Sequence, residues 1–112
     1  MNNFFVDLNL VRFLNGFGIS LNQYDICGFK NGVFEAIKSA LNAKTRINRL
    51  ILLSPSACFC EDSLREIQDK GVKIIVFLDA KDEDSMKILE FFKKFAIVYC
   101  IKEVDNLFKD RK

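Results

Sequence analysis

The sequence predicts an α/β fold in which helices flank a mostly parallel sheet of five or six strands, in three layers, within a single domain over residues 1–112. Three observations lead to this prediction. The chain has 112 residues, half of them hydrophobic, and a chain of this size buries roughly two thirds of its surface around one core. Short apolar segments alternate with segments whose apolar residues recur at helical spacing. The helical segments are bounded by glycines or acidic residues, which are typical of helix ends.

The strands are expected in short apolar segments. Residues 4–20, FFVDLNLVRFLNGFGIS, are apolar enough for one long strand or two short ones, with a turn at Gly16 to Gly18. Four later segments are rich in Ile, Val, Leu and aromatic residues and end at Gly, Pro or charged residues, as buried strands do. They are YDICGF (24–29), RLILLSP (49–55), VKIIVFLDA (72–80) and AIVYCI (96–101).

Three segments between these strands have the periodicity of amphipathic helices. They are NGVFEAIKSALNAKT (31–45), EDSLREIQDKG (61–71) and EDSMKILEFFKKF (83–95). Acidic residues open the second and third, where they complement the helix dipole, and Gly71 stands where a left-handed cap would end the second. Alternating strands and helices predict a parallel sheet with right-handed crossovers, and such sheets form sites at the carboxyl ends of their strands.

The first strand-to-helix connection has the spacing of a nucleophile elbow, G-x-S-x-G. It reads Gly28-Phe29-Lys30-Asn31-Gly32, with Lys30 in the middle position. In an elbow the middle residue sits on a sharp turn, and the flanking glycines let neighbouring backbone approach closely. Ordinary strand-to-helix turns also carry glycines at this spacing, so the motif alone leaves both interpretations open.

Other segments agree with the elbow: FLNGFG before it, INRLILLSPSA after it, and GVKIIVFLDAKD with EFFKKFAIVYCIKEVDNLFKD towards the end. Together they resemble the α/β-hydrolases, and within that superfamily the short biotin-pathway esterases that demethylate pimeloyl-acyl carrier protein methyl ester. The resemblance spans roughly residues 12–109. It implies a minimal α/β-hydrolase-like domain without a lid, because only SACFC separates Pro55 from the next helix, where family members insert a helical cap.

The resemblance also implies roles for single residues. The nucleophilic serine of the family falls on Lys30, the acid on Asp82 and the histidine on Asn106. The loop Asn15-Gly16-Phe17-Gly18 matches the oxyanion loop, which is usually His-Gly-x-Gly. The two backbone N–H donors of the oxyanion hole would then come from Phe17 and Asn31.

The catalytic triad is incomplete, since the chain contains no histidine at all. Losing Ser or His from such a triad costs about 10⁶ in turnover. We therefore expect a non-catalytic pseudoenzyme, without a cofactor, that binds a small anion or a partner protein through the former active site. The candidate binding residues are Gly16, Phe17, Gly28, Lys30, Asn31 and Gly32.

Two alternatives stay open. One is a weak carboxylesterase or thioesterase that acts on acyl esters through Cys27, Lys30 or a group that the motifs do not identify. The other is a small flavodoxin-like binding domain, in which the hydrolase resemblance reflects shared architecture only. For Lys30 itself, an ion pair with Asp82 or Asp79 competes with anion binding beside the free N–H groups of the following helix.

The composition of the chain bears on metal binding, nucleic-acid binding and membrane contact. With four cysteines and no histidine, a metal site would need every thiolate, so we expect reduced cysteines and no metal. Seventeen basic and fifteen acidic residues give a charge of +2 in short runs, which argues against nucleic-acid binding. No apolar run is long enough for a bilayer and no signal peptide is evident, so we expect no membrane contact and a cytoplasmic location. Apolar surface left by the missing cap would suit a homodimer.

Overall fold

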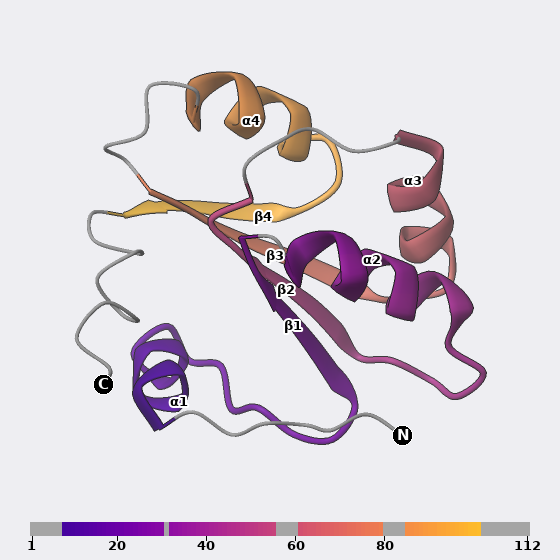
Figure 1. Ribbon diagram of the computed structural model, residues 1–112, viewed down its shortest axis with the longest axis horizontal. Helices are drawn as coiled ribbons and strands as arrows, with labels where there is room; N and C mark the ends of the chain where they lie inside the picture. Colours follow the sequence, from indigo (N-terminus) through magenta and orange to yellow (C-terminus); the bar gives the residue numbers. More distant parts are fainter. Residues whose placement is uncertain (1–7, 31, 56–60, 80–84, 102–112) are drawn as a thin grey trace.

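The computed structural model describes residues 8–30, 32–55, 61–79 and 85–101, and this part of the chain forms one sheet and four helices. The elements are α1 (Leu8–Asn15), β1 (Asp25–Phe29), α2 (Gly32–Asn42), β2 (Arg49–Leu53), α3 (Glu61–Asp69), β3 (Lys73–Asp79), α4 (Ser85–Phe92) and β4 (Ile97–Ile101). Strands and helices alternate from β1 onwards, as the sequence predicts. The α/β class with a parallel sheet is thereby confirmed (Figure 1).

The sheet has the strand order β1-β2-β3-β4, and every neighbouring pair is parallel. Because a right-handed crossover always steps across the same face, a sheet that grows in one direction collects its connecting helices on that face. The buried residues agree, since α2, α3 and α4 share one core cluster, whereas α1 belongs to another on the opposite face. Figure 1 shows α1 on the other side of the strands from α2, α3 and α4.

Two details of the prediction are wrong. The sheet of the described residues has four strands, not the five or six of the hydrolase-like sheet that we expected. One or two further strands were expected in residues 4–20, and the described part of that segment, from Leu8 onwards, instead forms α1 followed by a turn at Gly16–Gly18. The apolar residues Leu10, Phe13, Leu14 and Phe17 have the i, i+3, i+4, i+7 spacing of one helix face, and this face packs on the sheet.

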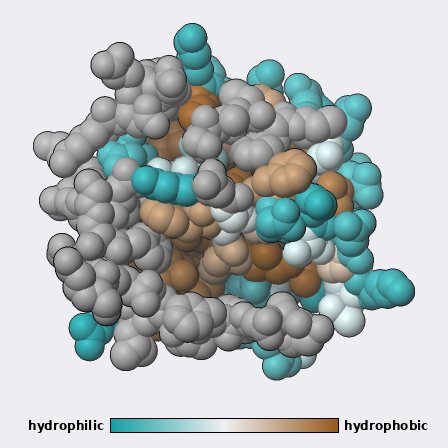
Figure 2. All heavy atoms as spheres, in the orientation of Figure 1, coloured by the Kyte–Doolittle hydropathy of each residue, from teal (hydrophilic) through white to brown (hydrophobic). Residues whose placement is uncertain are grey.

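The core is divided by the sheet because side chains alternate between its faces along each strand. Leu50 and Leu52 of β2 face α2, α3 and α4, whereas Ile51 and Leu53 face α1. On the α1 side, the Phe77 ring lies 5.0 Å from both the Phe13 and the Phe17 ring centroid. In Figure 2 apolar residues are visible at the middle of the drawn face, and hydrophilic residues lie on the outer side near α2 and α3.

The predicted helix ends are confirmed where the structure describes them. Glu61 and Asp62 lie in the first turn of α3. Gly71 has φ of +86° after the end of α3, and its N–H donates to the carbonyl of Gln68 at 2.8 Å. This is the left-handed conformation that favours glycine after a helix. The acidic residues expected to open α4, Glu83 and Asp84, lie outside the described residues.

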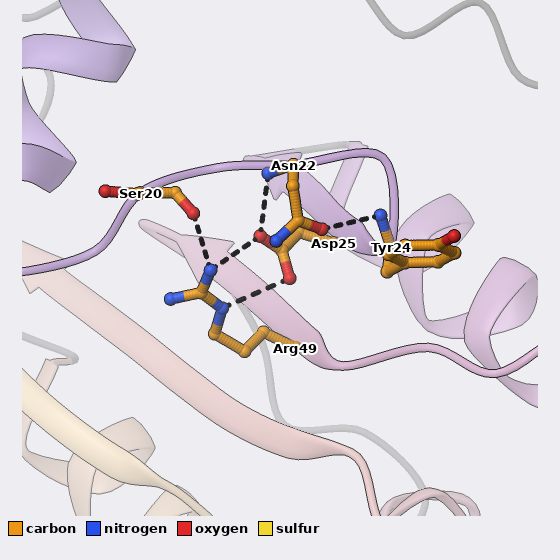
Figure 3. A network of polar contacts seen from close by, with 5 residues as sticks. All are labelled: Ser20, Asn22, Tyr24, Asp25 and Arg49. Carbon is orange, nitrogen blue, oxygen red and sulfur yellow. Dashed lines mark hydrogen bonds and ion pairs between the residues drawn. The ribbon is translucent and has the colours of Figure 1, made fainter.

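A polar network joins the amino ends of β1 and β2 (Figure 3). Asp25 is 2% exposed, and both of its carboxylate oxygens accept from the Arg49 guanidinium, at 3.1 and 2.9 Å. The Asn22 N–H donates to the same carboxylate, and Arg49 also donates to the carbonyl of Ser20 at 2.6 Å. Asp25 and Arg49 are directly paired in the β1–β2 register, so the ion pair fixes the start of that pairing.

Candidate functional site

The connection between β1 and α2 is a sharp turn centred on Lys30. β1 ends at Phe29 and α2 begins at Gly32, while Lys30 has φ of +51°, in the left-handed region. The Lys30 N–H donates to the carbonyl of Leu53 on β2 at 3.0 Å, and the Lys30 carbonyl accepts from the Val33 N–H at 3.1 Å. A residue with a Cβ in this conformation costs roughly 1–2 kcal/mol. The sequence therefore retains a strained lysine where glycine would be easier.

Gly28 makes this turn compact by letting α2 lie directly against β1. A Cβ at Gly28 would lie 2.7 Å from the carbonyl oxygen of Gly32 and 2.8 Å from both the Ala36 Cβ and the Val33 Cα. Such distances are too short for real contacts, so no other residue fits without moving the helix. At Gly32 a Cβ would meet nothing within 4 Å. The close approach that the elbow motif predicts is thus present at its first glycine and absent at its last.

A second strained residue lies beside Lys30. Ser54, which follows β2 directly, has φ of +54°, and its N–H donates to the carbonyl of Phe77 on β3 at 2.7 Å. Since Phe29 pairs with Leu53, the two left-handed residues are level at the carboxyl ends of adjacent strands. Backbone strain often concentrates at functional sites. Sequence reasoning missed Ser54, and its place between a buried strand and the single proline, Pro55, was the available signal.

Asp79 ends β3 at the same edge of the sheet. It is 8% exposed, and it lies two residues beyond Phe77, which pairs with Leu53. The carboxyl edge therefore carries Lys30, Ser54 and Asp79 on three consecutive strands. β1 and β3 are separated by β2, which puts their backbones roughly 10 Å apart. The Lys30 Nζ lies 5.6 Å from the centroid of the neighbouring Phe29 ring, within range of a cation–π contact.

The structure places the other predicted site residues in two separate regions. Gly28 near the end of β1, Lys30 in the turn and Gly32 at the start of α2 lie close together at the connection between these elements. Gly16 and Phe17 follow α1 on the other face, and the Phe17 N–H, which the hydrolase resemblance made an oxyanion donor, already donates to the Leu14 carbonyl at 2.9 Å. A substrate oxygen would have to compete with that bond.

Three predicted positions, Asn31, Asp82 and Asn106, lie outside the described residues. The ion pair between Lys30 and Asp82, and the positions of the triad acid and of the residue replacing its histidine, therefore stay predictions.

Cys27 lies on β1, three residues before Lys30, but its environment disfavours the thiolate. Burial raises the pKa of the thiol to about 12, the nearby Asp25 carboxylate adds to the increase, and the Arg49 guanidinium opposes it. The thiolate is the nucleophilic form of cysteine. This environment therefore disfavours Cys27 as a nucleophile near neutral pH.

Alkylation can test this conclusion. We expect iodoacetamide at pH 8 to modify the exposed Cys100 and to leave Cys27 unmodified, because a thiol with a pKa of about 12 is about 0.01% thiolate at that pH. The experiment uses the Cys58→Ser/Cys60→Ser variant and identifies modified peptides by mass spectrometry. In urea both remaining thiols should react equally. Rapid labelling of Cys27 in the folded protein would contradict the inferred environment.

The described residues also bear on metal binding and on membrane spans. Across the described ranges, no group of three or more Cys, Asp or Glu side chains is arranged to hold a metal ion. None of the described helices has the length and apolar character required to traverse a bilayer. A wide depression of about 500 Å³ lies at the opposite, amino end of β3 and β4, and its lining includes Gln68, Lys73 and Ile97.

Comparison with known proteins yields no match to a family model, to a curated protein or to a solved structure. The likeness to hydrolases therefore rests on the sequence motifs named above, and the candidate site rests on its own geometry.

Proposed function

We propose that this protein is a non-catalytic relative of the α/β-hydrolases that binds a small anion, such as a carboxylate or phosphate, beside Lys30. The observation that carries the proposal is the strained turn that presents this lysine. A left-handed lysine costs stability that a glycine would not, so a binding role for the ammonium accounts for a lysine at this position. Gly28, which no larger residue can replace without moving α2, makes the compact turn possible.

The surroundings of Lys30 favour an anion as the ligand. α2 begins two residues after Lys30, and the positive end of its dipole adds to the charge of the ammonium. The carboxyl end of a parallel sheet is the usual place for ligands in α/β proteins.

Three properties argue against the esterase alternative. The chain has no histidine to act as a general base, and the thiol nearest to the turn has its pKa raised to about 12. The remaining nucleophile candidate, Lys30, is an exposed side chain, whereas a lysine nucleophile requires a desolvated amine. The flavodoxin-like alternative differs in predicting no role for Lys30.

The decisive variant is Lys30→Gly. We expect it to raise the free energy of unfolding by about 1 kcal/mol, because glycine adopts the left-handed conformation without strain. The same variant should weaken binding of inorganic phosphate and of octanoate at least about fivefold, since the cation is lost. Stability is read from urea denaturation, and binding from amide chemical shifts of Val33 and its neighbours during titration.

Lys38→Gln is the matched control, because Lys38 is an exposed lysine of α2, the helix that follows Lys30, and lies over the Phe34 ring as Lys30 lies over Phe29. It removes an equal charge and should leave binding unchanged. If wild-type protein shows no shift with either anion, or if both variants weaken binding equally, the proposal is wrong. Turnover of short acyl esters or thioesters above background, abolished in Lys30→Gly, would instead support the esterase.

A further inference from the structure

Among the described residues, no strand pairs with the outer edge of β4. β4 is the last strand of the sheet and pairs with β3 alone among the described strands. Half of the N–H and C=O groups of an edge strand point away from its neighbour. Between residues of the described ranges, no backbone hydrogen bond outside the helices and the sheet involves Ile97–Ile101. The backbone itself therefore offers a template for one more strand.

β4 also lacks the features that usually protect such an edge. Natural edge strands carry lysine, proline or a bulge that prevents pairing with another chain. The sequence IVYCI has no charge and no proline, and its register with β3 runs without a bulge. Ile97 is 45% exposed, and Cys100 is exposed as well. An apolar β-branched side chain at this exposure favours burial in an interface.

The opposite edge strand, β1, differs from β4 in its charge and in the exposure of its side chains. It contains a charged residue, Asp25, which is 2% exposed, and Gly28, which lies tightly under α2. Of the two edges, β4 is the one whose side chains remain most accessible, with no fully buried residue along its length.

We propose that β4 pairs with β4 of a second copy of this chain, antiparallel about a two-fold axis, so that two sheets join into one of eight strands. Identical strands are self-complementary in this arrangement, as isologous interfaces require. With the axis at Tyr99, Ile97 lies opposite Ile101 of the second copy and Val98 lies opposite Cys100. All cross-strand contacts are then apolar or weakly polar, and such pairs stabilise sheets.

Charge selects the antiparallel arrangement over the parallel one. Lys93 and Lys94 are exposed in the turn that directly precedes β4. Parallel pairing would bring the lysines of both copies together, whereas antiparallel pairing puts them at opposite ends of the interface. A five-residue strand pair alone buries less than about 1,200 Å², which is typical of weak or transient complexes. The dimer is therefore expected to dissociate on dilution.

Sedimentation velocity over a dilution series tests the proposal. Wild-type protein should shift from the 12.9 kDa monomer to a species of twice that mass as concentration rises. Ile97→Lys places a charge on the edge and should weaken the dimer at least about tenfold. Tyr24→Lys is the matched control, because Tyr24 is 47% exposed next to β1, at the other edge. It should leave dimerisation unchanged.

Amide hydrogen exchange gives a second test that needs no substitution. In a concentrated sample all amides of Ile97–Ile101 should be protected, and on dilution the outward-facing ones should exchange faster while those bonded to β3 stay protected. If Ile97→Lys fails to fold by circular dichroism, Ile97→Thr replaces it. A wild-type monomer at every concentration, or equal loss of the dimer in Tyr24→Lys, would overturn the proposal.

Discussion

Replacing Gly28 by alanine is expected to lower the free energy of unfolding by about 3 kcal/mol, among the larger effects of adding one methyl group to a protein. The new Cβ would lie 2.7 Å from a backbone carbonyl oxygen of α2 and 2.8 Å from the Val33 Cα. Backbone atoms cannot rotate away as a flexible side chain can, so α2 must move off β1. Urea denaturation followed by circular dichroism measures the effect.

Gly32→Ala provides the control on the same turn. A Cβ at Gly32 meets nothing within 4 Å, and alanine is up to about 1 kcal/mol more favourable than glycine in a helix. This variant should be neutral or more stable than the wild type. Equal destabilisation by both substitutions would show that the turn tolerates no side chain for reasons other than the contact at Gly28.

Breaking the pair between Asp25 and Arg49 is the second large expected effect. Arg49→Met should lower the free energy of unfolding by about 3 kcal/mol, because it leaves a buried carboxylate without its guanidinium partner. The Asp25 side chain is fully buried, whereas that of Arg49 is 22% exposed, so the loss should be at the lower end for buried pairs. The midpoint and slope of urea denaturation measure this loss of unfolding free energy.

Two comparisons sharpen this prediction. The double variant Asp25→Asn/Arg49→Met should be more stable than Arg49→Met alone. It removes the buried carboxylate charge that Arg49→Met leaves unpaired, and it keeps a side-chain oxygen that accepts from the Asn22 N–H. Arg65→Met breaks the exposed pair with Glu61, whose pKa the hydrogen bond from Arg65 lowers, and it should leave the midpoint nearly unchanged. A double variant no better than Arg49→Met would indicate that packing, not charge, supports this end of the sheet.

The strands and helices from residue 24 onwards could be predicted because their patterns of apolar residues differ clearly. VKIIVFLDA is a continuous apolar run, as a strand buried on both faces requires, and EDSLREIQDKG shows helical spacing with acidic residues first. The local pattern did not decide between a helix and a strand for α1, although Leu10, Phe13 and Leu14 have helical spacing. Its eight residues are preceded by further apolar residues and followed by glycines, which also suit strands.

The topology of the sheet explains why a segment before β1 packs on its other face. When every crossover helix lies on one face, the other face of the sheet must be covered by a segment outside the crossovers. The residues before β1 provide that cover, with Leu14 fully buried against Ile51, Leu53 and Phe77. The helix is therefore a consequence of tertiary packing more than of propensity.

The site was predictable in part. The turn at Lys30 and the close approach at Gly28 follow from the glycine spacing, and both are present. Ser54 was not foreseen, because a left-handed serine has no composition signal of its own. The predicted oxyanion donor Phe17 shows a different limit, since a motif identifies the residue but not whether its N–H is already bonded within a turn.

The even spacing of the strands along the chain has a consequence for synthesis. Paired residues are 24 positions apart between β1 and β2, 24 between β2 and β3, and 22 between β3 and β4. Each strand can therefore dock as soon as it leaves the ribosome, on an edge that the preceding segment has already formed, without waiting for the carboxyl terminus. The chain can assemble in the order in which it is translated, and the edge of β4 is the last to be made.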